Sequence, residues 1–297
     1  MTHALTHPYL LLTLTVLFWS GNMVTGRGLR EDVPPILLAL LRWLIALGLT
    51  LPFAARAFDR MQLTTMLRAW PAMLLLGLLG VGGFNTFAYL ALQHTTATNA
   101  SLLNSFIPIV TIALSWALLG RRLLAVEALG VVVSMAGVVL IVGRGDPAVL
   151  LALSLNQGDL WMLLAVLTWA LYTVGLQWRP GGLDPMVMLA AFTLIGLVAL
   201  VPAALAEYLA GGRLHASPGT IAGILYTGVF PGFLGYVFYN RGVAAVGPNR
   251  GALFIHLMPA FGTGLAALFL GERPGWFHFT GIAMIFAGIY LNTRRRP

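Results

Sequence analysis

The stretch that decides the fold runs from Ala97 to Arg122, ATNASLLNSFIPIVTIALSWALLGRR, and it returns as Pro248 to Arg273, PNRGALFIHLMPAFGTGLAALFLGER. At a spacing of 151 residues Pro108 falls on Pro259, and the Leu-Gly pair that ends each copy falls on its counterpart. The same spacing aligns glycines in the apolar segment that follows. Unrelated apolar segments rarely share prolines, glycines and an arginine in one register, so the pattern indicates an internal duplication.

The composition indicates a polytopic membrane protein. Hydrophobic residues make up 59% of the 297 residues and charged residues 9%, and the mean hydropathy is +0.89. A soluble globular domain carries about 25% charged residues. A soluble chain as apolar as this one would have too few polar side chains to cover its surface.

Charge and cysteine usage exclude several partners and chemistries. The net charge is +8, but the arginines stand singly between apolar runs and form no basic face, so no nucleic-acid partner is expected. The chain has no cysteine, which excludes disulfides, thiolate metal sites and cysteine nucleophiles. No cofactor is expected. The first apolar run lacks a basic leader and is expected to be a retained helix.

Ten apolar runs are long enough to cross a bilayer, since a spanning helix needs about 20 mostly apolar residues. Their length and the lack of strict alternation favour helices over barrel strands. The expected spans are Pro8–Arg27, Pro34–Ala55, Leu67–Leu92, Thr95–Leu119, Leu124–Val142, Gly158–Trp178, Pro185–Leu209, Pro218–Arg241, Gly247–Leu270 and Gly275–Asn292.

The runs divide into two halves. Residues 1–143 form the expected first repeat, 144–157 a connection, and 158–297 the second repeat. With the N-terminus inside, eleven arginines lie on the inner side and five on the outer side, which predicts that both termini are cytoplasmic. Each repeat has five spans, an odd number, so the two copies are expected to insert in opposite orientations. Such inverted repeats are typical of secondary transporters, whose substrate site lies near the bilayer midplane.

Several segments carry a family resemblance. Phe18–Gly26, FWSGNMVTG, resembles the "WG-x-N-F" opening of the EamA-type drug/metabolite transporters, and LLALLRWLIAL resembles their second-helix signature. YLALQHTTATNASLL and YNRGVAAVGPNRGALF are similar to the family's helix junctions, and LMPAFGTGLAALFLGERP to its "P-x3-A-LL-x-LGE" ending. The resemblance covers almost the whole chain. It departs at Gly120-Arg121-Arg122, where the family usually has Gly-Glu. Since only the second copy, Gly271-Glu272-Arg273, keeps this acid, no essential role is expected for it.

The resemblance implies an all-α membrane protein of ten helices in two five-helix inverted repeats, working by alternating access. The nearest likeness is to bacterial exporters of amino acids, aromatic ones included. The implied function is export of small metabolites across the bacterial inner membrane. Drug-like or quaternary compounds and a sugar-phosphate or nucleotide-type cargo remain alternatives. The expected partners are a small-molecule substrate and the lipid bilayer, with the protein as a monomer.

No sequence motif of an enzyme is present, since HExxH, GxSxG, a P-loop and paired mid-span carboxylates are all missing from the chain. All nine acids lie near span ends, which disfavours a tightly ion-coupled mechanism. Facilitated export, or coupling through His256 or Glu207, is left open.

Polar and aromatic residues inside the spans are the candidates for a substrate site, because polar side chains avoid hydrocarbon. Arg42 lies about two turns into the second span, where it could bind a substrate carboxylate or act as a structural arginine. Trp19 and Asn22 share one helix face, and Trp169 and Tyr172 repeat their spacing in the sixth span. Packing is the alternative role for each of these aromatic pairs.

Two further groups occupy matching spans. Aromatic and amide residues follow glycines in spans three and eight, which predicts flexible helices that line a cavity, with simple packing as the alternative. Asn104 and His256 are cavity candidates in spans four and nine, with interhelical hydrogen bonding as the alternative. The expected substrate-binding residues are Trp19, Asn22, Arg42, Phe84, Asn85, Tyr89, Asn104, Trp169, Tyr172, Tyr236, Tyr239 and His256. No catalytic or metal-binding residue is expected.

Overall fold

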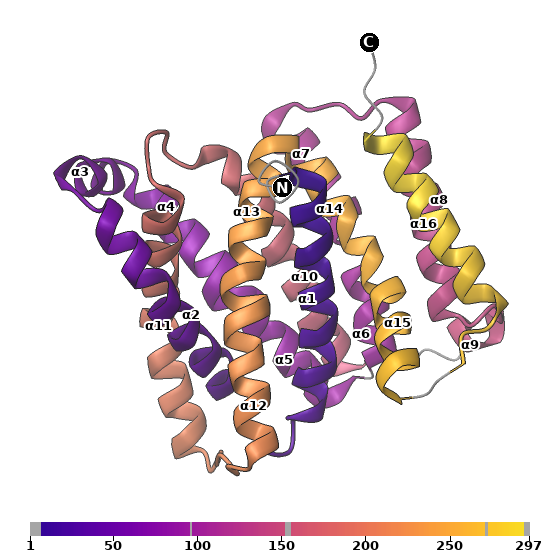
Figure 1. Ribbon diagram of the computed structural model, residues 1–297, viewed down its shortest axis with the longest axis horizontal. Helices are drawn as coiled ribbons and strands as arrows, with labels where there is room; N and C mark the ends of the chain where they lie inside the picture. The colour runs from indigo at the N-terminus through magenta and orange to yellow at the C-terminus, as the bar shows by residue number, and fades with distance from the viewer. Residues whose placement is uncertain (1–6, 96, 152–155, 271–272, 294–297) are drawn as a thin grey trace.

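The protein is a bundle of helices (Figure 1). The computed structural model describes residues 7–95, 97–151, 156–270 and 273–293, and within these ranges every regular element is a helix. In chain order the elements are α1 (Pro8–Gly28), α2 (Pro35–Ala57), α3 (Arg60–Arg68), α4 (Trp70–Gly77), η1 (Leu78–Gly83), α5 (Phe84–His94), α6 (Ala97–Asn104), α7 (Ile107–Leu119), α8 (Ala125–Val142), α9 (Pro147–Leu151), α10 (Gln157–Gly175), η2 (Leu176–Trp178), α11 (Pro185–Leu209), α12 (Pro218–Thr227), η3 (Gly228–Leu234), α13 (Gly235–Val246), α14 (Pro248–Leu253), η4 (Phe254–Leu257), α15 (Met258–Leu270) and α16 (Trp276–Thr293).

Local sequence explains where many helices begin. Asp184 caps α11 by accepting hydrogen bonds from the backbone N–H groups of Met186 and Val187, and a proline follows the cap. Ser217 caps α12 in the same way. Side-chain oxygens at such positions satisfy N–H groups that have no partner within the helix. Proline suits the first turn because its fixed φ matches the helix.

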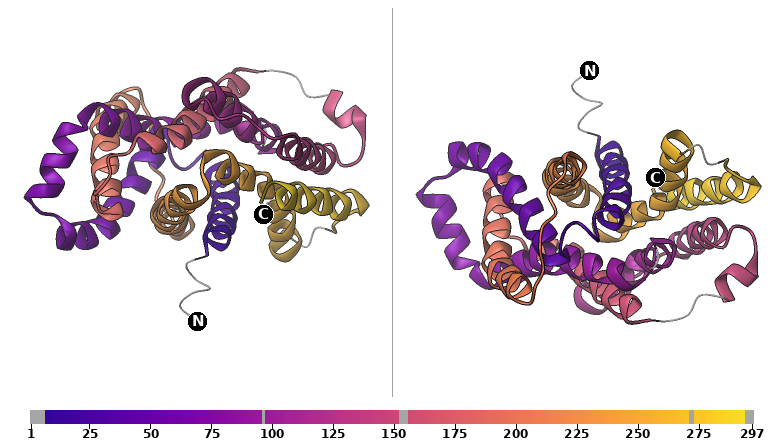
Figure 2. Two further views of the ribbon diagram at one scale, coloured as in Figure 1. Left: turned by 90° about the horizontal axis from the view of Figure 1, so that it is seen from above. Right: turned by 90° about the horizontal axis from the view of Figure 1, so that it is seen from below.

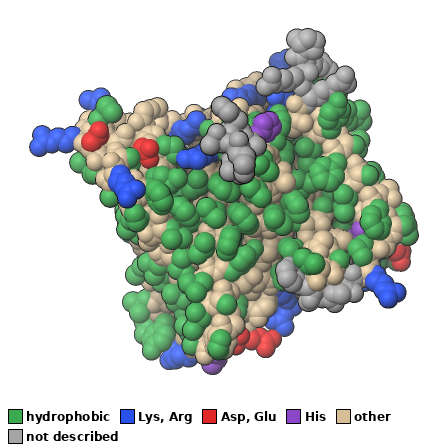
Figure 3. Space-filling view, viewed as in Figure 1, with side chains coloured by type: hydrophobic (Ala, Val, Ile, Leu, Met, Phe, Trp, Pro, Cys, Tyr) green, Lys and Arg blue, Asp and Glu red, His purple; other side chains and the backbone are tan. Residues whose placement is uncertain are grey.

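Eight helices or joined helical runs in the described part of the chain are long and apolar enough to cross a membrane. They are Pro8–Gly28, Pro35–Ala57, Trp70–His94, Leu102–Leu119, Ala125–Val142, Gln157–Trp178, Pro185–Leu209 and Pro218–Val246. Apolar side chains cover the middle of the face shown in Figure 3, and charged side chains gather toward its upper and lower ends. The protein is therefore a multi-pass membrane protein.

The ninth and tenth expected spans are not among these eight. The run expected over Gly247–Leu270 is divided into α14, the 3-10 segment η4 and α15. The run expected over Gly275–Asn292 is α16, of 18 residues. In the connection between the halves, α9 is described, whereas residues 152–155 lie outside the described part, as does Glu272.

The elements repeat at the spacing found in the sequence. α7 and α15 begin 151 residues apart and each has 13 residues, and α8 and α16 begin 151 residues apart and each has 18. α2 and α11 begin 150 residues apart, and their interior prolines, Pro52 and Pro202, also match. Both π-helical segments, η1 and η3, occupy matching positions before α5 and α13. The duplication therefore extends to the backbone.

One helix pair joins the two repeats at an edge of the bundle. α8 and α16 lie side by side in both views of Figure 2. A Cβ added at Gly130 would meet the Gly288 carbonyl oxygen, and one added at Gly137 would meet the Gly281 carbonyl oxygen. The contacts run in opposite chain directions, so the two helices are antiparallel. Only glycine permits so close an approach of two helix backbones.

Hydrogen bonds identify the two ends of the bundle. At one end, the Tyr9 hydroxyl at the start of α1 donates to the backbone carbonyl of Thr293, the last residue of α16, at 3.4 Å. At the other end, Arg27 in the last turn of α1 donates to the Thr95 carbonyl, and the Thr95 hydroxyl donates to Asp159 in the first turn of α10. We call these the Tyr9 end, which is at the top in Figure 1, and the Thr95 end.

Candidate functional site

A narrow cavity lies at the centre of the bundle, between helices of both repeats. Its empty space is about 310 Å³, and almost none of that space is wide enough for a water molecule. Eight of the residues expected from the sequence line it: Trp19, Asn22, Arg42, Phe84, Asn85, Asn104, Trp169 and Tyr236. The cavity is therefore nearly filled by its own side chains in this conformation.

Arg42 is the charged group of the cavity wall, and its side chain is 1% exposed. Its guanidinium donates to Asn22 Oδ1 at 2.9 Å, to the Tyr89 hydroxyl at 3.2 Å and to the Pro231 carbonyl at 3.0 Å. The guanidinium carbon also lies 5.5 Å from the Trp43 ring centroid. Among the described residues, no carboxylate lies within ion-pair distance of Arg42, and its Nε has no hydrogen-bond partner. A buried charge without a counterion is costly.

Aromatic rings form much of the remaining wall. The Trp19 and Trp169 rings meet edge to face with centroids 4.8 Å apart, and Phe84 lies 4.9 Å from Trp169. Tyr236 and Tyr239 pack on the same tryptophans. The spacing is typical of interacting aromatic pairs. The wall therefore offers ring faces and edges beside one positive charge.

The π segments supply backbone acceptors to this wall. In a π turn the N–H bonds to the carbonyl five residues back, as Phe84 does to Leu79 and Gly235 to Phe230. The Pro231 carbonyl in η3 accepts from both Arg42 and the Trp19 indole. At the matching position in η1, the Gly80 carbonyl accepts from the Tyr236 hydroxyl. Single π turns are frequent at functional sites.

Two tyrosine–asparagine hydrogen bonds occupy equivalent places in the repeats. The Tyr89 hydroxyl on α5 donates to Asn22 Oδ1 on α1 at 2.8 Å. The Tyr172 hydroxyl on α10 donates to Asn240 Oδ1 on α13 at 2.8 Å. Asn22 and Tyr172 are 150 residues apart, and Tyr89 and Asn240 are 151 apart. The same contact is thus made twice, with the residue types exchanged.

The two bonds lie toward opposite ends of the bundle. Asn22 and Tyr89 are near the ends of α1 and α5, which reach the Thr95 end. Tyr172 and Asn240 are near the ends of α10 and α13, toward the Tyr9 end. Each bond therefore lies on its own side of the central aromatic cluster.

A second hollow lies next to the Tyr172–Asn240 bond. Its empty space is about 750 Å³ including the part open to solvent, and Asn240 lines it together with Arg179 and Arg241. The remaining lining is mostly apolar and comes from the start of α11 and the end of α13. Tyr172 in turn packs on Trp169 with ring centroids 5.1 Å apart. The Tyr172–Asn240 bond therefore links the lining of this hollow to the wall of the central cavity.

The other expected residues lie outside the described lining of the cavity. Tyr89, Tyr172 and Tyr239 stand directly behind it, and the Tyr239 hydroxyl bonds to the Thr173 hydroxyl at 2.9 Å. His256 is buried elsewhere, where Nδ1 bonds to the Ser134 hydroxyl at 2.7 Å and Nε2 to the Ser105 carbonyl at 2.9 Å. The structure thus places His256 in an interhelical network.

Two carboxylates have structural roles as helix caps. Glu207 accepts from the backbone N–H groups of Ile36 and Leu37 at the start of α2. Asp159 is fully buried and accepts from Thr95, Asn99 and the backbone N–H of Asn156. These bonds hold the starts of α2 and α10 in place.

Sequence reasoning missed four lining residues: Met23, Ile107, Ile255 and Met258. In so apolar a chain, nothing separates an apolar residue beside a cavity from one in the packed core. Met258 has a polar contact here, since the Asn104 amide donates to its sulfur at 2.9 Å. The acceptor role of the Pro231 carbonyl was also missed, because side-chain patterns do not reveal a π turn.

A bundle of apolar helices around a buried, partly polar cavity defines a multi-pass membrane protein with an internal cavity. The profile of the EamA-like transporter family matches residues 7–143 and 156–294, so the chain belongs to that family. The resemblance expected from the motifs is confirmed.

The relatives are transporters. An uncharacterized transporter of Archaeoglobus fulgidus is 31% identical over 288 residues, which cover 97% of this chain and 98% of the relative. A probable terminal-alkyne amino-acid exporter of Streptantibioticus cattleyicolor is 26% identical over 235 residues, 77% of this chain and 74% of the relative. A solved crystal structure that is 20% identical has a TM-score of 0.78 and covers 96% of both chains, which shows the shared fold.

Proposed function

We propose that the protein is a secondary transporter that exports amino acids, aromatic ones included, from the cytoplasm by alternating access around the central cavity. The observation that carries the proposal is Arg42, a buried guanidinium on the cavity wall with no carboxylate partner among the described residues. A cargo carboxylate would supply the missing counterion. Its Nε donor is free to take part in a charge-assisted bond.

The remaining wall suits the rest of an amino acid. Asn104 lines the cavity, and its side-chain oxygen is buried without a hydrogen-bond partner in the described structure. This oxygen is an acceptor for a cargo ammonium group. Trp19, Phe84 and Trp169 provide ring surfaces on which a flat or apolar side chain can pack. The relative from Streptantibioticus, named as a probable amino-acid exporter, supports the same cargo class.

We further propose ten spans in two inverted repeats, with α14–α15 and α16 as the ninth and tenth. The antiparallel packing of α8 on α16 supports inversion, because these two helices are equivalent in the repeats. The Tyr9–Thr293 bond places the start of the first helix and the end of the last helix at the same end of the bundle. An even number of spans requires this arrangement. In this proposal the protein lies in the bacterial inner membrane, and the arginine distribution favours an orientation with the Tyr9 end in the cytoplasm.

The two exchanged tyrosine–asparagine bonds serve as gates in this proposal. The Tyr172–Asn240 bond closes the cavity toward the hollow that contains Arg179 and Arg241, which is the cytoplasmic access route. The Tyr89–Asn22 bond closes it toward the Thr95 end. Both are formed in this structure, and the cavity is too narrow for cargo. Transport requires each bond to open in turn, with rocking of one repeat against the other.

Arg42 also argues against the alternative cargos. A quaternary or other cationic compound would be repelled by a buried guanidinium. A sugar phosphate or nucleotide is a dianion and is usually met by several cationic groups. Arg42 is the single charged residue among those described on the cavity wall. One arginine matches one carboxylate.

Counterflow into liposomes tests the proposal. Purified protein is reconstituted in vesicles loaded with unlabelled amino acid, and the uptake of labelled aromatic and aliphatic amino acids is followed. We expect uptake by the wild type and at least about a tenfold loss in Arg42→Gln, since a hydrogen bond to a charged group contributes about 1.5–3 kcal/mol. Lack of uptake of every amino acid in both gradient directions would refute the proposal.

A matched control separates binding from folding. Arg56→Gln removes an exposed arginine from the last turn of the same helix, α2, away from the cavity and its access route, and should leave the thermal unfolding midpoint unchanged. If Arg42→Gln unfolds the protein, Arg42→Lys keeps the charge but loses the planar fork of donors. Folded Arg42→Lys with full counterflow activity would contradict a role for the guanidinium in binding the cargo.

A further inference from the structure

A third hollow lies at the Tyr9 end, on the edge of the bundle where the two repeats join. The connection between α7 and α8 brings Arg121 and Arg122 to it from the first repeat, and α14 brings Arg250 from the second. Its empty space is about 660 Å³ including the part open to solvent. It is distinct from the central cavity and from the hollow beside Asn240.

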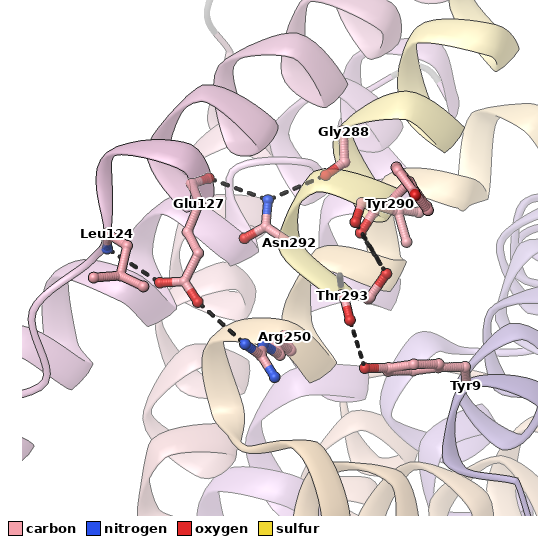
Figure 4. Close-up of polar contacts among 9 residues, drawn as sticks. Tyr9, Leu124, Glu127, Arg250, Gly288, Tyr290, Asn292 and Thr293 are labelled. Atoms are coloured by element: carbon pink, nitrogen blue, oxygen red, sulfur yellow. Dashed lines mark hydrogen bonds and ion pairs between the residues drawn. The ribbon is translucent and has the colours of Figure 1, made fainter. Parts of the chain in front are cut away.

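The charge of the hollow is strongly positive. Three arginines line it, and Glu127 is the single carboxylate among the described lining residues, which leaves a net of two positive charges. Arg250 lies 3.4 Å from Glu127 (Figure 4), and that carboxylate also accepts from the Leu124 N–H. Glu127 is therefore occupied as a helix cap and neutralises only part of the cluster.

A hydrogen bond and a close backbone contact fix the position of Arg121 in this hollow. The Arg121 guanidinium donates to Gln177 at 3.2 Å and lies against Gly247, where an added Cβ would come within 3.1 Å of it. Gly247 has a φ of 86°, which side chains rarely adopt. No described residue bonds to the Arg122 guanidinium, so its donors face solvent or a ligand. Arginine donors are suited to bidentate binding of a phosphate.

The surroundings of the hollow point to a lipid as the source of that phosphate. The ends of α8 and α16 line the hollow, and large apolar side chains are exposed on the same two helices, with Leu124 just before α8 at 48%, Leu129 at 53% and Tyr290 at 61%. Asn292, the next-to-last residue of α16, is buried, lines the hollow and donates to the carbonyls of Glu127 and Gly288 (Figure 4). A phosphate over the arginines could thus place its acyl chains on an exposed apolar surface.

We propose that this hollow binds a phosphate group, and that in the membrane the phosphate belongs to an anionic phospholipid. Basic pockets between helices on the cytoplasmic side are suited to such headgroups. Because the arginines come from both repeats, a bound headgroup bridges the halves of the protein on this edge. The inference concerns a lipid site and does not depend on the identity of the cargo.

Thermal unfolding of purified, delipidated protein in detergent tests the proposal, with three ligands titrated separately. These are phosphatidylglycerol, the zwitterionic phosphatidylcholine, and inorganic phosphate. The wild type should be stabilised saturably by phosphatidylglycerol and much less by phosphatidylcholine. R121Q/R122Q should need roughly 30-fold more phosphatidylglycerol for the same shift, since each arginine near an anionic lipid surface contributes about fivefold.

The matched control is R60Q/R68Q. It removes two exposed arginines from α3, which lies at the same end of the bundle but away from the hollow. It should respond to phosphatidylglycerol as the wild type does. Equal titration midpoints for R121Q/R122Q and the wild type would overturn the proposal. So would an equal loss in R60Q/R68Q, which would indicate a general charge effect.

The amount of bound lipid is a second readout. Native mass spectrometry should count retained phosphatidylglycerol on the wild type and on R60Q/R68Q, and less on R121Q/R122Q. Saturable stabilisation by inorganic phosphate without any response to phosphatidylglycerol would overturn the lipid assignment and favour a soluble phosphate ligand. If R121Q/R122Q fails to fold, Arg122→Gln alone carries the test, with an expected loss of about fivefold.

Discussion

Tyr172 donates its hydroxyl hydrogen to Asn240 over 2.8 Å, and this bond is the counterpart of the Tyr89–Asn22 bond with the residue types exchanged. The duplication has thus preserved an interaction while changing which helix carries the phenol. Conservation of the bond through an exchange of residues indicates that the contact itself matters.

Loss of either gate bond should open the cavity from one side only. The chain has no cysteine, so Met258→Cys on the cavity wall is a single reporter. In Tyr172→Phe, a membrane-impermeant maleimide should label this cysteine about fivefold faster from the Tyr9 end, because a hydrogen bond contributes about 1 kcal/mol. Tyr89→Phe should accelerate labelling from the Thr95 end.

The control for the gates is Tyr290→Phe, which removes a phenol hydroxyl from a side chain that is 61% exposed on α16. It should leave both labelling rates unchanged. Acceleration from the same side in both gate variants would contradict the assignment, as would unchanged rates in both.

Asn104 should distinguish amino acids from acids that lack the amino group. Asn104→Leu removes the buried oxygen that has no partner in the described structure. In competition against counterflow, we expect about tenfold weaker inhibition by an amino acid, and unchanged inhibition by the 2-oxo acid with the same side chain. Equal weakening for both compounds would show that Asn104 does not read the ammonium group.

Asp159 should contribute strongly to stability. Asp159→Asn removes a buried carboxylate that accepts three hydrogen bonds at the Thr95 end. We expect a loss of about 2 kcal/mol in unfolding free energy, measured by unfolding in mixed micelles with increasing SDS. Asp146→Asn is the control, because Asp146 is an exposed cap whose replacement by Asn should cost less than about 0.5 kcal/mol. Similar losses in the two variants would contradict the role of burial.

The glycine contact between α8 and α16 should tolerate no added methyl group. In Gly288→Ala the new Cβ would meet the Gly130 carbonyl oxygen and Ser134, so the helices must separate. We expect a loss of about 1–3 kcal/mol in the same SDS assay. Gly262→Ala is the control, since nothing lies within 4 Å of its added Cβ, and alanine favours a helix by up to about 1 kcal/mol. Gly288→Ala as stable as Gly262→Ala would be incompatible with the packing.

Much of the helical framework could be predicted from the sequence, because helix ends carry local signals. The expected span Pro185–Leu209 coincides with α11, where a capping aspartate and a proline mark the start. The repeat could be predicted because prolines and glycines stand in one register. Such residues act on their own backbone, so their effect does not depend on distant contacts.

The details of the site could not be predicted in the same way. A π turn changes backbone hydrogen bonding without changing composition, so the acceptor role of Pro231 is invisible in the sequence. His256 lies in the 3-10 segment η4, where it bonds to Ser134 and Ser105, and neither the segment nor these partners could be read from the sequence. For Arg42 the sequence left two roles open. Its hydrogen-bond partners lie on three separate segments, at Asn22, Tyr89 and Pro231, and only the folded structure brings these segments together.

The exchanged tyrosine–asparagine bonds have a thermodynamic consequence. Two equal bonds of 2.8 Å, one broken in each open form, cancel in the free-energy difference between the inward- and outward-open conformers. The resting preference between these conformers must then come from contacts without a counterpart. The bond from the Thr95 hydroxyl to Asp159 is such a contact, since valine, which has no hydroxyl, occupies the matching position, Val246. Every 1.4 kcal/mol of that imbalance changes the ratio of the two populations about tenfold.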